Sequence, residues 1–97
     1  MKAFVIATID VQDPVRYADY VKLTPGTIEP FGGKFIARGG RLDKLEGSLL
    51  ANRVVVLEFP SFEQAKAWYD SEGYRVARTI RQSASTGSLV LVEGVAP

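Results

Sequence analysis

The sequence predicts an α+β fold, in which two helices cover one face of a four-stranded antiparallel sheet, as a single domain over residues 1–97. Two observations favour this fold. A β-branched apolar run leads into a capped helix twice, once from residue 3 and again from residue 53. The chain of 97 residues is long enough for one hydrophobic core and too short for a second.

The first half of the chain begins with a strand and a helix. Residues 3–10 (AFVIATID) are rich in β-branched side chains and predict the first strand. Asp13 before Pro14 is the usual arrangement of a helix N-cap and the first helical residue. We expect Pro25 to interrupt this helix, and Gly32 to end one further helical turn, because proline lacks the amide hydrogen and glycine favours the left-handed cap.

Two short strands and the connection between them follow. Residues 34–38 predict the second strand, and residues 53–59 (RVVVLEF) predict the third. Glycine within a strand commonly marks a bulge or a sharp bend, so we expect one at Gly39 and Gly40. We expect residues 41–46 to continue the second strand as a bent extension, and residues 47–52 to form the turn into the third strand.

The second helix has a clear start and an expected break. Ser61 and Gln64 match the capping-box pattern S-x-x-Q, in which a serine hydroxyl accepts a hydrogen bond from the amide three residues on. Gly73 is expected to break or kink this helix, because glycine is unfavourable in a helix interior. Val76 and Ile80 are expected to continue the apolar stripe beyond the break.

The chain ends in a short loop and a last strand. Small residues over 83–87 predict the loop, and residues 88–93 (SLVLVE) predict the fourth strand. The element order is therefore β-α-β-β-α-β, which is the split βαβ or ferredoxin-like topology.

Both faces of the predicted sheet are apolar, although two helices can cover only one of them. Successive strand residues point to opposite faces, and the first, third and fourth strands carry apolar residues on both. A contiguous apolar patch of this size is uncommon on a monomer. We therefore expect a homodimer through the uncovered sheet face, which would present Phe4, Ile6, Ile36, Val54, Val56, Leu89 and Leu91.

Composition excludes several classes of function. The net charge is +1 and the arginines are scattered, so we expect no nucleic-acid partner. The chain has no cysteine and no histidine, which removes thiol chemistry, imidazole catalysis, haem ligation by histidine and the usual zinc sites. We therefore expect no cofactor and no metal. Without a signal peptide or a long apolar run, we expect a cytoplasmic protein that does not associate with membranes.

Three sequence blocks carry a resemblance to a known family. They read IDVxDPxxYxxY over residues 9–20, GGKFxxRGG over residues 32–40 and EFPSFxxAxxWYxSxxY over residues 58–74. The blocks span most of the chain, which resembles the small bacterial family called domain of unknown function 1330. The resemblance implies a dimeric α+β barrel, a superfamily that also contains quinone-forming monooxygenases, stress-response barrels and haem-handling proteins. It implies no established activity. Gly73 departs from the larger residue that the family usually has before Tyr74.

Five aromatic residues are candidates for a ligand site: Tyr17, Tyr20, Trp68, Tyr69 and Tyr74. Clefts lined by aromatic side chains between a helix and a sheet are common ligand sites. The structural alternative is that these rings belong to the core and its edges, where aromatic side chains bury large areas.

Two charged residues are candidates for chemistry. Arg38, beside two glycines, could present its guanidinium to an anionic or carbonyl group, or could pair with a carboxylate at the sheet edge. Glu58 follows two valines on the sheet face that the helices leave open, where a charge needs a partner. Unpaired, Glu58 could act as a general base; its structural alternative is an ion pair with Lys34 on the neighbouring strand.

Two functions remain open. The first is a homodimer that binds a small organic ligand, or serves as a structural or accessory protein. The second is a cofactor-independent enzyme, similar to a monooxygenase or an isomerase, acting on an aromatic or quinone-like substrate. In either case the candidate cleft is lined by Tyr17, Arg38, Glu58, Trp68 and Tyr74. An open cavity with polar groups favours binding or catalysis, whereas a cavity filled by its own side chains favours neither.

Overall fold

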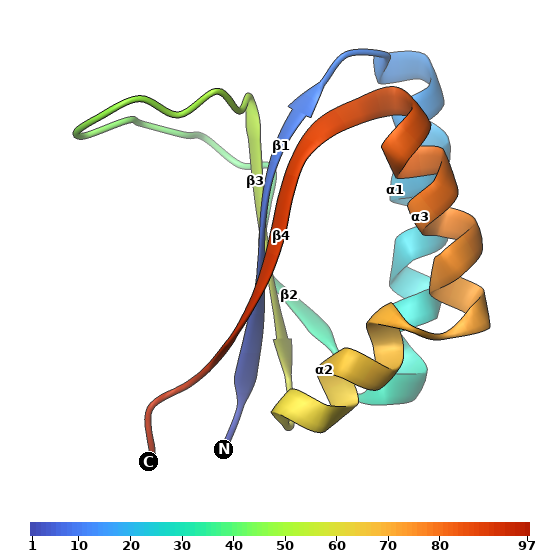
Figure 1. Cartoon of the computed structure of the whole chain (residues 1–97), viewed down its shortest axis with the longest axis vertical. Helices are drawn as coiled ribbons and strands as arrows, with labels where there is room; N and C mark the ends of the chain where they lie inside the picture. The colour runs from blue at the N-terminus through green and yellow to red at the C-terminus, as the bar shows by residue number, and fades with distance from the viewer.

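The computed structural model describes all residues 1–97 and shows one antiparallel sheet with every helix on the same side (Figure 1). The strands lie in the order β2-β3-β1-β4, which is the ferredoxin-like order, so the predicted α+β fold class is confirmed. In chain order the elements are β1 Ala3–Val11, α1 Pro14–Ile28, the 3₁₀ turn η1 Glu29–Phe31, β2 Lys34–Arg38, β3 Arg53–Phe59, α2 Phe62–Tyr69, α3 Glu72–Ala84 and β4 Ser85–Glu93.

Helix α1 begins where the sequence predicts and continues further than expected. The Asp13 carboxylate accepts a hydrogen bond from the amide of Arg16 at 3.1 Å, and this is the predicted N-cap. The predicted interruption at Pro25 is wrong, because α1 runs through it to its end. Pro25 has no amide hydrogen for the carbonyl of Val21, one turn earlier, but Arg38 on β2 donates to that carbonyl at 2.7 Å. A partner distant in the sequence therefore replaces the missing bond.

The second helical region is divided into α2 and α3 by a serine cap. Ser61 accepts from the amide of Gln64 at 3.1 Å, which confirms the predicted start of α2. The predicted break at Gly73 is wrong, because Gly73 lies in the first turn of α3. The break lies two residues earlier, where Ser71 accepts from the amide of Tyr74 at 3.3 Å and caps α3.

Strand β4 starts directly after α3, so the loop predicted over residues 83–87 is wrong. Ser85 already pairs with Val11, and the two long strands β1 and β4 stay in register from there to Glu93. Gly87 lies within the strand at a φ of 144°, where a Cβ atom would lie 2.1 Å from the carbonyl oxygen of Thr8. Glycine thus permits the close approach of the two strands at this point.

The predicted bulge lies in β2 rather than at the glycine pair. The register between β2 and β3 shifts between Phe35 and Ala37, so Ile36 is the extra residue. Gly39 instead follows the last residue of the strand with a φ of 65°, and its amide donates to the carbonyl of Val54 at 3.0 Å. The expected extension of the strand over residues 41–46 is wrong, because β2 ends at Arg38.

The two faces of the sheet are both apolar, as the sequence predicts. Residues of β1 alternate between buried positions under the helices and half-buried positions on the open face. One part of the prediction is wrong: Leu89 and Leu91 pair with Ala7 and Val5 and pack against the core under the helices. The apolar residues of the open face are Phe4, Ile6, Ile36, Val54, Val56, Val90 and Val92.

The core consists of two clusters separated along the sheet. The larger one gathers around Trp68 and contains Val5, Ile28, Leu57, Phe59, Ala65, Tyr74 and Ala77. The smaller one, near the start of α1 and the end of α3, contains Ala7, Ile9, Tyr17 and Ala84. Helices α1 and α3 lie side by side over the sheet (Figure 1). Between the two clusters the packing leaves a cavity.

Candidate functional site

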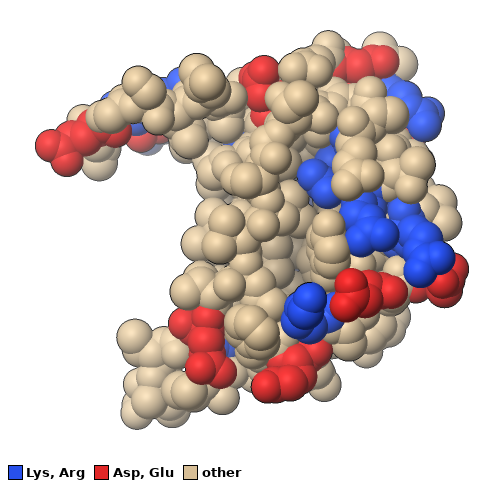
Figure 2. Space-filling model, in the orientation of Figure 1, with Lys and Arg blue, Asp and Glu red and all other residues tan.

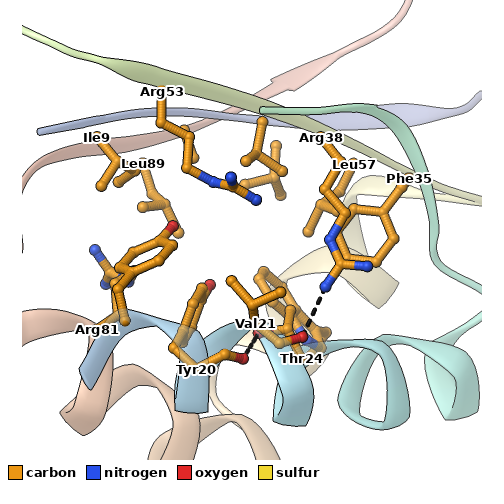
Figure 3. A pocket seen from close by; sticks show the side chains of 15 residues that line it. Ile9, Tyr20, Val21, Thr24, Phe35, Arg38, Arg53, Leu57, Arg81 and Leu89 are labelled. Atoms are coloured by element: carbon orange, nitrogen blue, oxygen red, sulfur yellow. Dashed lines mark hydrogen bonds between the residues drawn. The ribbon is translucent and has the colours of Figure 1, made fainter. Parts of the chain in front are cut away.

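The cavity lies between the helices and the covered face of the sheet (Figure 3). Its volume is about 20 Å³, which is room for about one water molecule. Most of its fifteen lining residues are apolar and come from both core clusters. The polar lining groups come from four elements and are Tyr17, Tyr20, Thr24, Arg38, Arg53 and Arg81.

A groove between α2 and β4 adjoins this cavity. The groove has a volume of about 160 Å³, and its walls include Ala65, Tyr69 and Leu91. Trp68 and Leu89, together with Val5, line both spaces and form the partition between them. A molecule in the groove would therefore be separated from the cavity only by side chains.

Arg81 is the most unusual residue of the cavity. It is only 7 % exposed, and its Nε atom is buried without a hydrogen-bond partner. The residue belongs to the buried face of α3, with Tyr74, Ala77 and Ala84 at helical spacing on the same side. No carboxylate lies within ion-pair distance of its guanidinium, since the three ion pairs of the molecule are elsewhere. The helix therefore places an unpaired positive charge in the interior.

Arg53 is the second guanidinium without a carboxylate partner. As the first residue of β3 it shares the covered face with Val55 and Leu57, and its Nε atom is also buried and unpaired. Figure 3 shows its guanidinium pointing from the sheet into the cavity. The guanidinium lies 5.4 Å from the ring centre of Tyr17 and packs against Gly39, where a Cβ would be 2.2 Å from Nη1. Gly39 thus leaves the space that this side chain occupies.

Arg38, which the sequence singled out, lines the cavity but already has partners. Its Nη2 atom donates to the carbonyl of Val21, and its guanidinium stacks 4.2 Å from the ring centre of Phe35. Figure 3 shows it on the side opposite Arg81. Arg38 therefore helps α1 to continue through Pro25. Arg53 and Arg81 have no comparable hydrogen bond to the backbone.

The two tyrosines of the cavity remain protonated near neutral pH. Burial raises the pKa of Tyr17, while the neighbouring Arg53 opposes this shift. Burial raises the pKa of Tyr20 far above its ordinary value, and the contact with Tyr74, whose hydroxyl lies 2.9 Å away, adds to the rise. Both phenols can thus donate a hydrogen bond, and neither is a base at neutral pH.

The structure brings together most of the predicted aromatic residues. Tyr17, Tyr20 and Trp68 line the cavity, and Tyr69 lines the groove. Trp68 is buried, and its indole N–H donates to the hydroxyl of Thr27 at 3.1 Å. Tyr74 lines neither space, because its fully buried ring packs 4.1 Å from Trp68.

Glu58 does not belong to this site, so its predicted place in the cleft is wrong. It points to the open face of the sheet, opposite Phe4 and Lys34 in the register. Its carboxylate pairs with Lys34 at 3.1 Å and with Lys2 at 3.5 Å. The hydrogen bond from Lys34 and the positive charge of Lys2 hold the pKa of Glu58 below its ordinary value. The structural alternative, an ion pair with Lys34, is therefore present.

Sequence reasoning missed Arg53 and Arg81. Arg53 could have been found from its position in β3, because it stands an even number of residues before the buried Leu57 and Phe59 and therefore points to the same face. Arg81 could have been found from its helical spacing to Tyr74 and Ala77, which are buried on the same side of α3. The apolar stripe that we predicted from Val76 and Ile80 lies on a different side of the helix and does not include Arg81. Val76 is in fact exposed.

Comparison with known proteins identifies the family. The family model described as domain of unknown function, DUF1330, matches residues 2–95. The chain belongs to the DUF1330 family. No curated protein matches the chain. The structure contains no helix with the length and apolar character needed to cross a bilayer, and no group of three or more acidic residues positioned to hold a metal ion.

Solved structures share the fold of this DUF1330 protein. A protein of unknown function from Rhodopseudomonas palustris is 21 % identical, with a TM-score of 0.79 over 99 % of this chain and 84 % of that one. A cofactor-independent oxygenase from Streptomyces nogalater is 12 % identical, with a TM-score of 0.66 over 99 % and 95 % of the two chains. A dimeric protein of unknown function and ferredoxin-like fold from Bacteroides fragilis is 13 % identical, with a TM-score of 0.65 over 96 % of each chain.

Proposed function

We propose that this DUF1330 protein is a cytoplasmic homodimer that binds a small, flat organic molecule between its helices and its sheet. The groove beside Trp68 and Leu89, which adjoins a cavity with polar groups, carries the proposal. An apolar space with a few convergent polar groups is the usual form of a small-molecule site. The groove would hold the apolar body of the ligand, and the cavity would receive its polar end.

Entry of a ligand into the cavity requires side chains to move. The cavity holds about 20 Å³ in this structure, and the guanidinium of Arg53 reaches into it. Arg53 is half-buried at the start of β3, and its side chain can rotate while the strand stays in place. We therefore expect Arg53 to be the group that moves when a ligand enters.

The apolar open face of the sheet supports the homodimer in this proposal. Figure 2 shows this side of the molecule as a hollow between the 39–52 loop and the C-terminal tail, with no charged residue visible in its middle and acidic residues at its lower end. Its apolar residues include Ile6, Val56 and Val90, and Val90 is 54 % exposed in the single chain. A second copy packed sheet to sheet would remove this surface from water and close a dimeric α+β barrel. The Bacteroides fragilis protein of the same fold is dimeric.

A second candidate function is that of a cofactor-independent enzyme for an aromatic or quinone-like substrate. The observation that favours it is the guanidinium of Arg53 beside the phenol of Tyr17, since the two could stabilise a developing oxyanion. The Streptomyces nogalater protein of the same fold is a cofactor-independent oxygenase. Glu58 would not supply the base, because it lies on the other face of the sheet.

Fluorescence of Trp68 tests the proposed function, because it is the only tryptophan and it separates the groove from the cavity. Titration with 1,4-naphthoquinone is expected to change its emission in a saturable way, with one molecule bound per chain. A quench that rises linearly with concentration would indicate collisions and would contradict the proposal.

A pair of variants locates the binding. Leu89→Phe adds a ring to the partition between groove and cavity and is expected to abolish the saturable change. Val76→Phe adds the same ring on the solvent side of α3, where Val76 is 61 % exposed, and should leave the titration unchanged. Equal responses of the two variants would place the quinone elsewhere.

A further inference from the structure

The charges that line the cavity are all positive. Three arginines, from β2, β3 and α3, contribute to its walls, and no aspartate or glutamate is among the fifteen lining residues. Arg53 and Arg81 each keep a buried Nε atom without a partner. Burying a charge is unfavourable unless it is paired, so positions like these need an explanation beyond folding.

We infer that the site takes a carboxylic acid, whose carboxylate binds to the guanidinium groups of Arg53 and Arg81. This inference rests on the proposed function and names the ligand class for the same site. The flat apolar part of the acid would lie in the groove beside Trp68, and its carboxylate would point past Leu89 into the cavity. Arginine binds carboxylates through paired N–H donors, which suits an interior site from which water is excluded.

The two arginines are suited to this role because no carboxylate of the chain pairs with either of them. The three ion pairs of the molecule involve Glu58 and Glu72, and neither residue lines the cavity. Arg38 is different, since it is exposed and already donates to the carbonyl of Val21. A ligand carboxylate would therefore bind to Arg53 and Arg81 without displacing a carboxylate of the chain, and it would meet Arg53 beside the phenol of Tyr17.

The size of the cavity and its hydroxyl groups favour a carboxylate over a phosphate. The free space of about 20 Å³ must widen less for a planar group with two oxygens than for a tetrahedral group with four. The phenol of Tyr17 stands beside Arg53 and stays protonated near neutral pH, so it can donate a further hydrogen bond to an anion. The neutral phenols also add no negative charge that would repel the ligand.

Calorimetric titration of the wild-type protein with three matched probes tests the inference. Benzoate carries the carboxylate, benzamide is its neutral analogue, and phenyl phosphate carries a larger anion on the same ring. Benzoate is expected to bind at least about tenfold more tightly than benzamide and phenyl phosphate, because it alone forms charge-assisted bonds that fit the space. Equal binding of benzoate and benzamide, tighter binding of phenyl phosphate, or no binding of benzoate would overturn the inference.

The proposed function is tested separately by the neutral naphthoquinone. A saturable response of Trp68 to the quinone, together with no preference for benzoate, would leave a ligand-binding protein that does not select acids. Loss of both responses would remove the inference and the proposed function together.

Arginine variants distinguish ligand binding from a structural role. Arg53→Met and Arg81→Met keep an unbranched apolar stem and remove the guanidinium with its charge, and each is expected to weaken benzoate binding about tenfold or more. Arg75→Met is the matched control, because Arg75 also lies on α3 but points to solvent. Unchanged benzoate affinity in both variants would contradict the assignment.

Thermal unfolding of the unliganded variants adds a second readout. Arg81→Met should unfold at the same temperature as wild type or higher, because it removes an unpaired buried charge. Added benzoate should raise the unfolding temperature of wild type and not that of the variant. A clear fall in stability of Arg81→Met with undiminished benzoate stabilisation would show a structural arginine. If Arg81→Met does not fold, Arg53→Met decides by the same two measurements.

Discussion

The two faces of the sheet treat buried charge in opposite ways. On the open face Glu58 is held between Lys2 and Lys34, so its charge is matched within the chain. On the covered face Arg53 and Arg81 each have a buried Nε atom without a partner, and neither has a carboxylate partner. A folding chain gains nothing from an unpaired interior charge, whereas a binding site does, because the ligand supplies the opposite charge.

The comparison separates two kinds of role within one sheet. The open face has the properties of an assembly surface, with apolar side chains in its middle and a satisfied ion pair at one end. The covered face carries a core cluster at each end, and between the two clusters lies the cavity with its few polar groups. Substitutions on the open face should therefore change association, and those on the covered face should change folding or binding.

The largest expected effect is loss of the dimer in Val56→Lys. Val56 lies in the middle of the open face, paired with Ile6 in the register, and a lysine there would place a charge inside the proposed interface. Light scattering at micromolar protein concentration should give a dimer for wild type and a monomer for the variant. Val15→Lys on the outer side of α1, where Val15 is 83 % exposed, is the control and should remain dimeric. A monomeric wild type would refute the assembly.

A smaller effect is expected from Tyr74→Phe, which acts on the covered face. Its hydroxyl pairs with that of Tyr20 at 2.9 Å between α3 and α1, and the variant leaves the Tyr20 hydroxyl without this partner. Loss of the pair should lower the free energy of unfolding by about 1–2 kcal/mol and leave the dimer intact. Tyr69→Phe is the control, because the Tyr69 hydroxyl makes no bond within the protein, and should change stability little. Urea denaturation measures both, and equal shifts would contradict the role of the pair.

Removal of the α2 cap is expected to have a similar or slightly smaller effect. Ser61 accepts from the amide of Gln64 at the start of the helix that carries Trp68. Ser61→Ala should lower the free energy of unfolding by about 1 kcal/mol, because that amide loses its partner. Ser61→Asp keeps an acceptor at the same position and should stay close to wild type. A midpoint of urea denaturation for Ser61→Ala that equals that of wild type would show that the cap contributes nothing.

The sequence predicted those parts of the fold that depend on nearby residues. Caps such as Asp13 and Ser61 are read from residues three apart, and the β-branched runs of β1 and β3 are read directly. Continuation of α1 through Pro25 was not predictable in this way. It depends on Arg38, which follows thirteen residues later and reaches Val21 only in the folded chain.

The candidate site was harder to predict, because packing between distant elements decides which face of each strand or helix points into the cavity. The run Leu-Val-Leu-Val in β4 is apolar at every position, so alternation alone could not tell that Leu89 lies under the helices. In α3, Val76 and Ile80 predicted an apolar face of the helix that does not include Arg81. Only the pairing of β4 with β1, and of α3 with α1, places these residues around the cavity.

The smallest expected effect comes from Glu58→Gln, and it tests whether the open-face charge is truly satisfied. The pKa of Glu58 is lowered from 4.5 by its hydrogen bond with Lys34 and by the charge of Lys2. A carboxyl group whose pKa is lower in the folded protein stabilises the fold above its ordinary pKa, and this stabilisation is lost as the pH falls through the folded value. At pH 7 the variant should therefore be slightly less stable than wild type. Below pH 4.5 the difference should shrink, because wild-type Glu58 then becomes protonated as well.

Urea midpoints measured from pH 7 down to pH 3 follow this change, with Glu46→Gln in the exposed loop as a control outside any ion pair. A difference that stays constant over this range would mean that the amide changes packing, and the contrast between the two faces would then rest on Arg53 and Arg81 alone.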